Sequence, residues 1–396
     1  MTTPSLRAAC EAVLRGNDRG HYTVPAPHLY PHQWAWDSAF AAIGWAYIDP
    51  ARAWRELRTL LDAQWEDGRV PHIVFHEPSD AYFPGPEFWE VERSSSITQP
   101  PFWAIAARRV VEISGLPRGL EPLVERIERS HRFFYEHRDP LGWDLVAVAH
   151  PWESGMDNLP AWDEPLSRVD VSNPPRFERK DRHIDPALRP TDDQYLRYAV
   201  LVKAIAQSGF AQGPFAVYDP FMSAVLARAE GDLEWLAQQV GVATSAGDRS
   251  LRIRQALKYH LWSEEAGRFF YYDAQERQAL SSDVLGCYAP LWSGTDPAAA
   301  AKLEAGMRER YRAPWPLPST TPVDPGHEAK RYWRGPCWVN LNWMFVDVLG
   351  PALAERTVEM VQGGGFREYF HCQTGEGLGA DSFTWTAALA LDLSAT

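Results

Sequence analysis

Two carboxylates, Glu153 and Asp157, stand four residues apart in a stretch (151–162) that also holds two tryptophans, a glycine and two prolines. The glycine and the prolines favour an irregular loop over a helix, and such a loop would present Asp157 at its break. Trp152 and Trp162 are expected to wall this carboxyl, and the resulting desolvation would raise its pKa, as a general acid requires. The competing interpretation is structural: the two carboxylates cap helices or pair with an arginine.

A second source of carboxylates lies near the other end of the chain. Residues 366–379 open a glycine-rich turn that contains Glu368 and Glu376. Two carboxylates from distant parts of one chain, inside an aromatic cleft, are the arrangement used in glycoside hydrolysis. The residues alone leave Glu368 and Glu376 as alternatives for the second carboxylate.

A proline-bound aromatic loop precedes the first strongly apolar helix. Trp34 and Trp36 flank a small residue there, so in an extended loop they would point to the same side and wall a sugar site. Asp37 follows directly, and two interpretations are equally weighted for it: a helix cap or a member of the site.

Three further polar side chains are candidates for the same cleft. His72 lies in an apolar extended stretch, where a hydrogen-bonded structural histidine is the favoured interpretation over a functional one. Tyr82 lies in a proline-rich loop and Gln99 just before a helix start, positions from which both side chains could face the cleft. The alternative for these two is a loop residue satisfied locally.

Helical periodicity dominates the elements that must position these residues, and strand alternation is scarce. Alanine-rich segments at 37–48 and 100–114 predict buried helices, and amphipathic partners follow them at 51–65 and 120–137. Segments 192–208 and 220–240 predict a third pair. The remaining predicted helices cover residues 6–14, 251–262, 283–291, 297–311, 333–349, 352–362 and 382–393.

This alternation of buried and amphipathic helices predicts an all-α fold, a closed double ring of helices known as an (α/α)6 barrel or toroid. The rival is a plain α-bundle of two domains. The long aromatic and proline-rich loops favour the toroid, because one end of such a barrel would gather them into a cleft. We therefore expect a single domain over residues 1–396, with loop insertions around 66–98, 140–191 and 312–332.

Composition excludes several classes of partner. The 396 residues carry a net charge of −13, which disfavours nucleic acid and anionic membrane. The mixed segment 176–182 is the nearest approach to a basic patch, and its interleaved acids predict a solvated loop. Aromatic residues make up 13% of the chain and suit a small-molecule carbohydrate partner.

The cysteines and the N-terminus point to the cytoplasm. The four cysteines are scattered, without metal-ligand spacing, and are predicted to be reduced thiols. There is no basic segment followed by an apolar run at the N-terminus, and no uncharged apolar stretch near 18 residues. The chemistry considered above needs no metal or cofactor.

Six motifs, in order along the chain, resemble those of glycoside hydrolase family 63, particularly the small bacterial mannosylglycerate and glucosylglycerate hydrolases and, more distantly, the trehalases. They are Tyr30 with Gln-Trp-Ala-Trp-Asp-Ser-Ala-Phe at 33–40, Glu-Ser-Gly-Met-Asp-Asn at 153–158, Arg-Tyr-Trp-Arg-Gly-Pro-Cys-Trp at 331–338, Glu368-Tyr369, Thr-Gly-Glu-Gly at 374–377 and Phe-Thr-Trp-Thr-Ala at 383–387. Together they extend across nearly the whole chain.

The resemblance implies an inverting α-glycosidase on an (α/α)6 barrel. Asp157 would be the general acid, and Glu368, rather than Glu376, the base. The implied substrate is glucosylglycerate or mannosylglycerate, hydrolysed to the free sugar and D-glycerate. The chain is short for the family around 140–191 and 312–332, so loops over the glycerate side are expected to be trimmed.

The same resemblance assigns two groups of binding residues. Trp34, Trp36, Asp37 and Trp338 would line the sugar subsite, with His72 nearby, and Trp333 is a further candidate for substrate binding. Tyr30, Tyr82, Gln99, Arg189, Tyr195 and Tyr332 would surround glycerate. Among these, Arg189 could hold a carboxylate through two parallel hydrogen bonds, and its alternative is a surface loop residue.

Three other functions compete with this prediction. Within the class, the substrate would be a neutral α-glucoside such as a trehalose-like disaccharide or an oligosaccharide. A sugar epimerase or isomerase on the same toroid would want paired histidines in the cleft. A non-catalytic sugar-binding protein would show the same aromatic lining without turnover.

Overall fold

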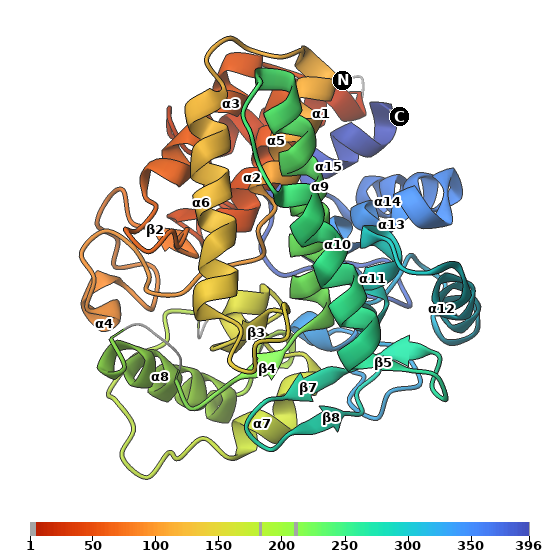
Figure 1. Cartoon of the computed structure of the whole chain (residues 1–396). Helices are drawn as coiled ribbons and strands as arrows, with labels where there is room; N and C mark the ends of the chain where they lie inside the picture. The colour runs from red at the N-terminus through yellow and green to blue at the C-terminus, as the bar shows by residue number, and fades with distance from the viewer. Residues whose placement is uncertain (1–4, 182–183, 210–212, 396) are drawn as a thin grey trace.

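The computed structural model describes residues 5–181, 184–209 and 213–395, and most of them lie in helices (Figure 1). The α-helices are α1 (Leu6–Asn17), α2 (Ala35–Ala46), α3 (Pro50–Asp62), α4 (Pro86–Trp89), α5 (Trp103–Ser114), α6 (Glu121–His137), α7 (Asp163–Ser167), α8 (Asp192–Gln207), α9 (Pro220–Val240), α10 (Ala246–Ala256), α11 (Ala289–Ser293), α12 (Pro297–Arg310), α13 (Val339–Leu349), α14 (Pro351–Gly364) and α15 (Thr384–Ala395). The strands are β1 (Gln33–Trp34), β2 (Ile73–Val74), β3 (Ala147–Val148), β4 (Val217–Tyr218), β5 (Trp262–Ser263), β6 (Arg268–Phe269), β7 (Tyr271–Asp273), β8 (Gln278–Leu280), β9 (Tyr369–Phe370) and β10 (Gly377–Leu378).

Contacts between helices close into a ring. In the described part of the chain, α2 packs on α5, α5 on α9, α9 on α11, α11 on α13, α13 on α15, and α15 returns to α2. Helices α1, α3, α6, α10, α12 and α14 pack against this inner ring from outside. The predicted (α/α)6 barrel is therefore confirmed, and the two ends of the described chain lie side by side in α1 and α15 (Figure 1).

The inner and outer helices differ in the way their sequences predict. Every residue of α2 is buried, and Gly44 lets it approach α15 so closely that a Cβ there would lie 2.6 Å from the Cβ of Ala388. In contrast, α3 buries one stripe only, and its start is fixed by Asp49, whose side chain accepts a hydrogen bond from the Arg52 amide. One continuous cluster of buried apolar side chains runs from Cys10 to Leu391.

Helix α8 departs from the prediction. Residues 192–208 were expected to pair with 220–240 in the double ring, but α8 lies among the loops and contacts α4, whereas α9 is an inner helix and α10 its outer partner. Most residues of α9 are buried, on several sides of the helix, while α8 buries one narrow face. A buried stripe shows that one face of a helix packs against the rest of the protein, but it does not identify the neighbouring element.

Two other predicted helices are shorter than expected. The segment 283–291 forms a 3₁₀ turn at Leu285–Tyr288 before the five-residue α11, and Gly286 there lies against the hydroxyl of Tyr271. The segment 333–349 starts in a 3₁₀ turn at Tyr332–Arg334 and becomes α-helical only at Val339, after the Gly335-Pro336 break.

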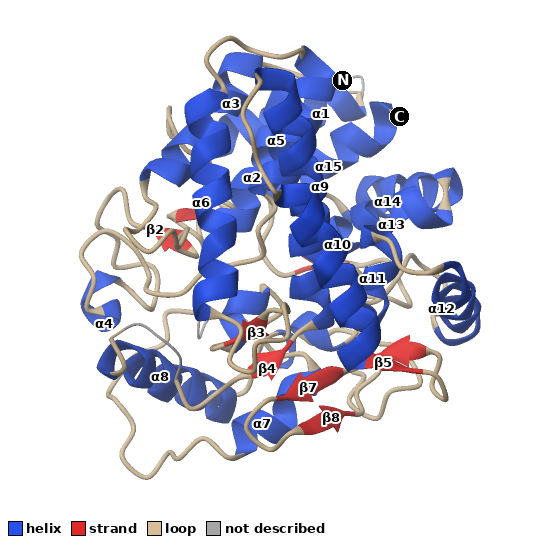
Figure 2. Ribbon diagram, viewed as in Figure 1, coloured by secondary structure: helices blue, strands red, loops and turns tan. Residues whose placement is uncertain are grey.

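Short antiparallel strands join the loops at one end of the barrel (Figure 2). Strand β1 pairs with β2, with Trp34 opposite Ile73, and so brings the first aromatic loop beside His72. A four-stranded sheet in the order β3-β4-β7-β8 lies next to the segment that carries Asp157, and β9 pairs with β10 beyond Glu368. Among the described residues, none of the helices combines the length and apolarity that crossing a bilayer requires.

Candidate active site

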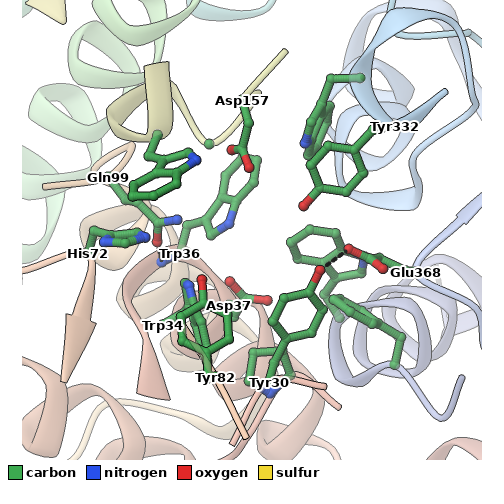
Figure 3. A pocket seen from close by; sticks show the side chains of 16 residues that line it. Tyr30, Trp34, Trp36, Asp37, His72, Tyr82, Gln99, Asp157, Tyr332 and Glu368 are labelled. Carbon is green, nitrogen blue, oxygen red and sulfur yellow. Dashed lines mark hydrogen bonds between the residues drawn. The ribbon is translucent and has the colours of Figure 1, made fainter. Parts of the chain in front are cut away.

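A cavity at the loop-bearing end of the barrel brings together residues from five separate parts of the chain (Figure 3). The empty space within it, counted out to the open mouth, is about 470 Å³. The lining includes eleven of the predicted site residues: Tyr30, Trp34, Trp36, Asp37, His72, Tyr82, Gln99, Asp157, Tyr332, Trp333 and Glu368. Pro25, Trp152, Gly155, Phe383 and Trp385 complete it.

A second cavity of about 490 Å³ adjoins the first and shares Tyr30, Tyr82, Trp152, Asp157 and Tyr332 with it. Its remaining lining is different in character and includes Arg179, Lys180, Asp181, Arg189 and Tyr195. The site therefore has an aromatic half and a charged half, with Asp157 at the boundary between them.

Asp157 is presented by the chain break that the sequence predicts. A 3₁₀ turn at Pro151–Ser154 ends at Gly155, whose φ of 72° is left-handed, and a Cβ there would lie 2.6 Å from the Trp36 ring. The Tyr198 hydroxyl donates a hydrogen bond of 2.7 Å to the Asp157 carbonyl oxygen and fixes the backbone. Burial, assisted by the charge of Glu368 and opposed by Arg189, raises the pKa of the Asp157 carboxyl to about 8. This carboxyl can donate a proton at neutral pH.

Glu153 pairs with an arginine, which is the structural role considered above for both Glu153 and Asp157. Its side chain is fully buried and accepts hydrogen bonds of 2.7 and 2.9 Å from the Arg138 guanidinium and one of 2.8 Å from the Ala149 amide. Burial alone would raise the pKa of Glu153, but these partners outweigh it and hold the pKa below its ordinary value. Glu153 therefore anchors the loop that carries Asp157.

Glu368 approaches the cavity from a different wall, just before β9 (Figure 3). Its Oε1 accepts a hydrogen bond of 2.7 Å from the Tyr30 hydroxyl, and its Oε2 accepts one of 2.9 Å from the Ala380 amide. Glu376, the alternative, is exposed on the surface. The structure therefore brings Glu368, and not Glu376, together with Asp157.

Arg189 is buried, with 3% of its surface exposed, so the alternative of a surface loop residue is wrong. Its Nη2 donates a hydrogen bond of 2.7 Å to the Tyr30 hydroxyl, and its Nη1 lies 3.5 Å from Glu368 Oε1. The guanidinium packs over the ring of Tyr332, 4.8 Å from the centroid. One cation thus touches the charged half of the site and the carboxylate of the aromatic half.

The described part of the segment 176–182 is a loop with Arg176, Glu178 and Lys180 exposed, as its composition predicts, but it also contributes ordered residues to the site. Arg179 donates a hydrogen bond of 2.9 Å to Asp181 and lies 3.9 Å above the ring of Tyr195, whose hydroxyl donates to Asp181 at 3.0 Å. Arg179, Lys180 and Asp181 line the second cavity, while Arg182 lies outside the described residues. The partner that orders them, Tyr195, is remote in sequence, so no local pattern indicates the pairing.

Two of the predicted tryptophans lie behind the cavity rather than on its wall. Trp162 was expected to wall Asp157, but its indole packs in the core and donates a hydrogen bond of 2.8 Å to the Met156 carbonyl. Trp338 is fully buried and stacks on Trp333, with centroids 3.5 Å apart, so Trp333 stands between it and the cavity. Trp385, from the start of α15, lines the cavity although the sequence assigned it no role.

Asp37 contributes a carboxyl to the aromatic half, beside Trp333 and Trp385. The indole N–H groups of Trp333 and Trp385 are buried and have no hydrogen-bond partner among the described residues. Asp37 lies in the first turn of α2, three residues after the cap position, so the cap interpretation is wrong. Burial raises the pKa of Asp37 well above its ordinary value. A carboxyl on the wall of the cavity suits the hydroxyl groups of a sugar.

His72 and Gln99 are held by neighbours while lining the same cavity. His72 Nδ1 lies 3.0 Å from the Ser95 hydroxyl, and burial lowers the pKa of His72 well below its ordinary value, so the ring is neutral. The Gln99 side-chain oxygen accepts a hydrogen bond of 3.2 Å from the Trp36 amide. Both residues therefore combine local hydrogen bonding with a place in the cavity.

The fold and the cavity together define a glycoside hydrolase: an (α/α)6 barrel with three carboxyls, Asp37, Asp157 and Glu368, in an aromatic pocket at its mouth. Residues 30–386 match the family described as Mannosylglycerate hydrolase MGH1-like glycoside hydrolase domain. The chain belongs to this family of glycoside hydrolases, and the resemblance to family 63 is confirmed.

Known relatives resemble the chain over nearly its whole length. The crystal structure of the GH63 mannosylglycerate hydrolase from Thermus thermophilus with Tris and D-glycerate matches with a TM-score of 0.94 and 40% identity, covering 99% of this chain and 100% of that one. A glucosylglycerate hydrolase from Mycolicibacterium hassiacum is 35% identical over 99% of this chain and 98% of its own length. Neutral trehalase from Saccharomyces cerevisiae shares the fold alone, with a TM-score of 0.62 and 15% identity over 98% of this chain and 79% of that one.

Proposed function

We propose that the protein is an inverting α-glycosidase that hydrolyses glucosylglycerate or mannosylglycerate to the free sugar and D-glycerate. In this mechanism Asp157 is the general acid and Glu368 the general base. The observation that carries the assignment is the contrast between the two carboxyls: Asp157 has a pKa of about 8, whereas Glu368 accepts hydrogen bonds from Tyr30 and Ala380. One is suited to give a proton at neutral pH and the other to take one.

The proposed reaction uses Asp157 as the proton donor and Glu368 as the proton acceptor. Asp157 protonates the glycosidic oxygen as its bond to the anomeric carbon breaks, and Glu368 takes a proton from the water that attacks the opposite face of the ring. Glycerate leaves with the proton from Asp157, and the sugar keeps the hydroxyl of the water. Proton exchange with solvent then resets both carboxyls. Inversion requires room for the water, so the carboxyl groups are expected ~6.5–9.5 Å apart.

The two halves of the site fit the two parts of such a substrate. The sugar would lie in the aromatic half, against Trp34, Trp36, Asp37 and Trp333, with His72 nearby and Trp338 supporting Trp333 from behind. Glycerate would lie in the charged half, near Tyr82, Tyr195 and Tyr332, with its carboxylate on Arg189. The names of the relatives, mannosylglycerate hydrolase and glucosylglycerate hydrolase, support this choice.

The competing sugar isomerase finds little support in the cavity. His72 is the one histidine among the described residues that line either half, and its low pKa keeps it neutral. An acid–base pair of histidines, which that chemistry would use, is not available there. For the setting of the enzyme we propose the cytoplasm, because the four cysteines are buried and unbridged in the described chain.

Proton NMR on a panel of α-glycosides tests the proposal, because it reports turnover and product anomer together. Glucosylglycerate, mannosylglycerate and trehalose would be compared at equal concentration. We expect the β-anomer of the free sugar to appear first with the two glycerate substrates. First release of the α-anomer would exclude inversion, and binding without turnover of any α-glycoside would exclude the enzyme assignment.

Arg189→Ala tests the placement of the carboxylate. Loss of a charge-assisted bidentate partner is expected to lower kcat/KM for a glycerate substrate by about 10²-fold or more. A neutral disaccharide, which lacks the carboxylate, should lose much less. Equal losses on both substrates would exclude Arg189 as the carboxylate partner.

A further inference from the structure

Arg189 connects the charged half of the site to Glu368 by two routes. Its Nη1 lies 3.5 Å from Glu368 Oε1, and its Nη2 donates a hydrogen bond of 2.7 Å to the Tyr30 hydroxyl. That hydroxyl donates in turn to the same Glu368 oxygen at 2.7 Å. The positive charge of Arg189 therefore bears on Glu368 directly and through Tyr30.

The same guanidinium is incompletely satisfied on its other edge. Arg189 Nε is buried and has no hydrogen-bond partner among the described residues, and its nearest acid, Asp181, lies 3.5 Å away. Asp181 is already engaged by Arg179 at 2.9 Å and by the Tyr195 hydroxyl at 3.0 Å. Asp181 therefore satisfies this edge of Arg189 only at ion-pair distance, and a ligand carboxylate in the charged half would add a second anion beside the same guanidinium.

We propose that Arg189 couples the charge of the leaving group to catalysis: a carboxylate on the substrate neutralises Arg189, loosens its hold on Glu368 and lets Asp157 act as a proton donor to higher pH. This inference rests on the proposed function and assigns Arg189 a second task beyond binding. It predicts that a glycerate substrate prepares the enzyme for its own hydrolysis, whereas a neutral analogue does not.

The direction of the expected shift in pH dependence follows from the charges of these groups. A nearby cation favours the ionised form of a carboxyl, so a free Arg189 draws the proton from Asp157, and its ion pair with Glu368 competes with the attacking water for that carboxylate. The pKa of Asp157, raised to about 8 by burial, is indeed lowered by Arg189 and raised by Glu368. Pairing Arg189 with a substrate carboxylate cancels part of its field. Glu368 is then released from its ion pair with Arg189, and Asp157 retains its proton to higher pH.

Other charged groups face these residues and do not cancel the effect. Asp181 and Arg179 face Arg189 as a pair, so their net charge is small with and without ligand. Burial raises the pKa of Asp37, which faces Glu368 from α2, well above its ordinary value, and this keeps its charge small. The four tyrosines around Arg189 also have raised pKa values and stay neutral; they are Tyr30, Tyr82, Tyr195 and Tyr332.

A matched pair of substrates separates binding from activation. Glucosylglycerate and glucosylglycerol differ by a carboxylate in place of a hydroxymethyl group, and pH profiles would be recorded for both under conditions where chemistry limits kcat. The kcat/KM profile reports the free enzyme, and the kcat profile reports the complex. With glucosylglycerate we expect the basic limb of the kcat profile, which reports Asp157, to lie about 1 pH unit above that of kcat/KM. With glucosylglycerol the two basic limbs should coincide.

Three variants identify the residues responsible. Arg189→Gln should abolish the displacement of the basic limb, and Tyr30→Phe, which keeps the ring, should reduce it. Arg179→Gln is the matched control, because Arg179 lines the same half but pairs with Asp181 rather than Glu368; it should raise KM and keep the displacement. If Arg189→Gln does not fold, as judged by circular dichroism, Tyr30→Phe and the substrate pair still decide the matter.

The outcomes distinguish this inference from the proposed function. Turnover of both substrates by the unmodified enzyme, with coincident basic limbs for each, would overturn the inference and leave the glycosidase assignment intact. A displacement that persists in Arg189→Gln would also overturn it, because another group would then carry the effect. Failure to hydrolyse either substrate would overturn both.

Discussion

Replacing Asp157 by asparagine is expected to stop turnover and, at the same time, to stabilise the folded protein. The variant loses the proposed proton donor, so kcat should fall by several orders of magnitude, on the order of 10³-fold or more. The folded state of the unmodified protein, however, disfavours the ionised form of Asp157, and the variant no longer carries that penalty. Stability gained with activity lost is the signature of a carboxyl held for chemistry.

The size of the effect follows from the pKa. Burial raises the Asp157 pKa from 3.8 to about 8, a difference of about four units. Each unit corresponds to ~1.4 kcal/mol, which sets an upper bound on the order of 5 kcal/mol at pH 8. The asparagine amide must also find hydrogen-bond partners in the cavity, so we expect a net gain of about 2–3 kcal/mol.

The pH dependence is a sharper test than the absolute value. Between about pH 4 and pH 8 the folded protein holds a proton on Asp157 that the unfolded chain releases, so stability falls as pH rises in this window. The slope contributed by this one group reaches ~1.4 kcal/mol per pH unit. Asp157→Asn removes that contribution. The excess of its free energy of unfolding over that of the unmodified protein should therefore grow from pH 5 to pH 8 and level off above pH 8.

Glu153→Gln is the matched control from the same loop, with the opposite sign. The Arg138 guanidinium helps to hold the Glu153 pKa below its ordinary value, so this group adds stability above the pKa of the unfolded chain and loses it as pH falls. Removing the charge leaves Arg138, which is fully buried, without its partner. We expect a loss of about 3–5 kcal/mol at pH 7.

Urea unfolding at pH 5, 6, 7 and 8 measures all three proteins on one scale. We expect the free energy of unfolding of Asp157→Asn to exceed that of the unmodified protein by a margin that grows with pH. The free energy of unfolding of Glu153→Gln should lie below that of the unmodified protein at neutral pH. A constant offset for Asp157→Asn across the series would refute the elevated pKa, and with it the argument that burial keeps this carboxyl protonated.

Three further predictions concern the site. Gly379→Ala would place a Cβ 2.4 Å from Glu368 Oε2 at a φ of 70°, so kcat should fall on the order of 10²-fold, measured beside a melting curve to show that the fold persists. The basic limb of kcat/KM should lie near pH 8, where Asp157 ionises, and a profile that stays flat to pH 9.5 would contradict that assignment. Phe177→Ala removes a ring stacked on Phe83 with centroids 5.1 Å apart, joining two loops beside the cavity; KM should rise about threefold to tenfold with kcat retained.

Local sequence carries the information for features whose cause is local. The inner helices α2 and α5 could be predicted because helices rich in alanine and apolar side chains differ from amphipathic ones. Asp157 could be predicted because the glycine break and the flanking aromatic residues lie within a few positions of it. Neither prediction required knowledge of a distant partner.

Features that depend on distant partners were predicted wrongly or left open. The sequence ranked Trp152 and Trp162 equally as walls of Asp157, because an irregular loop has no period to say which indole turns inward. The contact of Arg179 with Tyr195 was not predicted, because Tyr195 lies on a helix whose position depends on the whole fold. The helix containing Tyr195 was itself misplaced for the same reason.

An acidic protein can hold an anionic substrate here because charge is organised locally. The net charge of −13 is a property of the whole surface, whereas the cavity collects Arg179, Lys180 and Arg189 on one side. Helices α2 and α15 also begin at the cavity, and the positive ends of their dipoles favour negative charge there. Because Arg189 is buried, a single carboxylate would meet it with little screening by water. The excess of acids elsewhere repels polyanions without preventing recognition of one desolvated carboxylate.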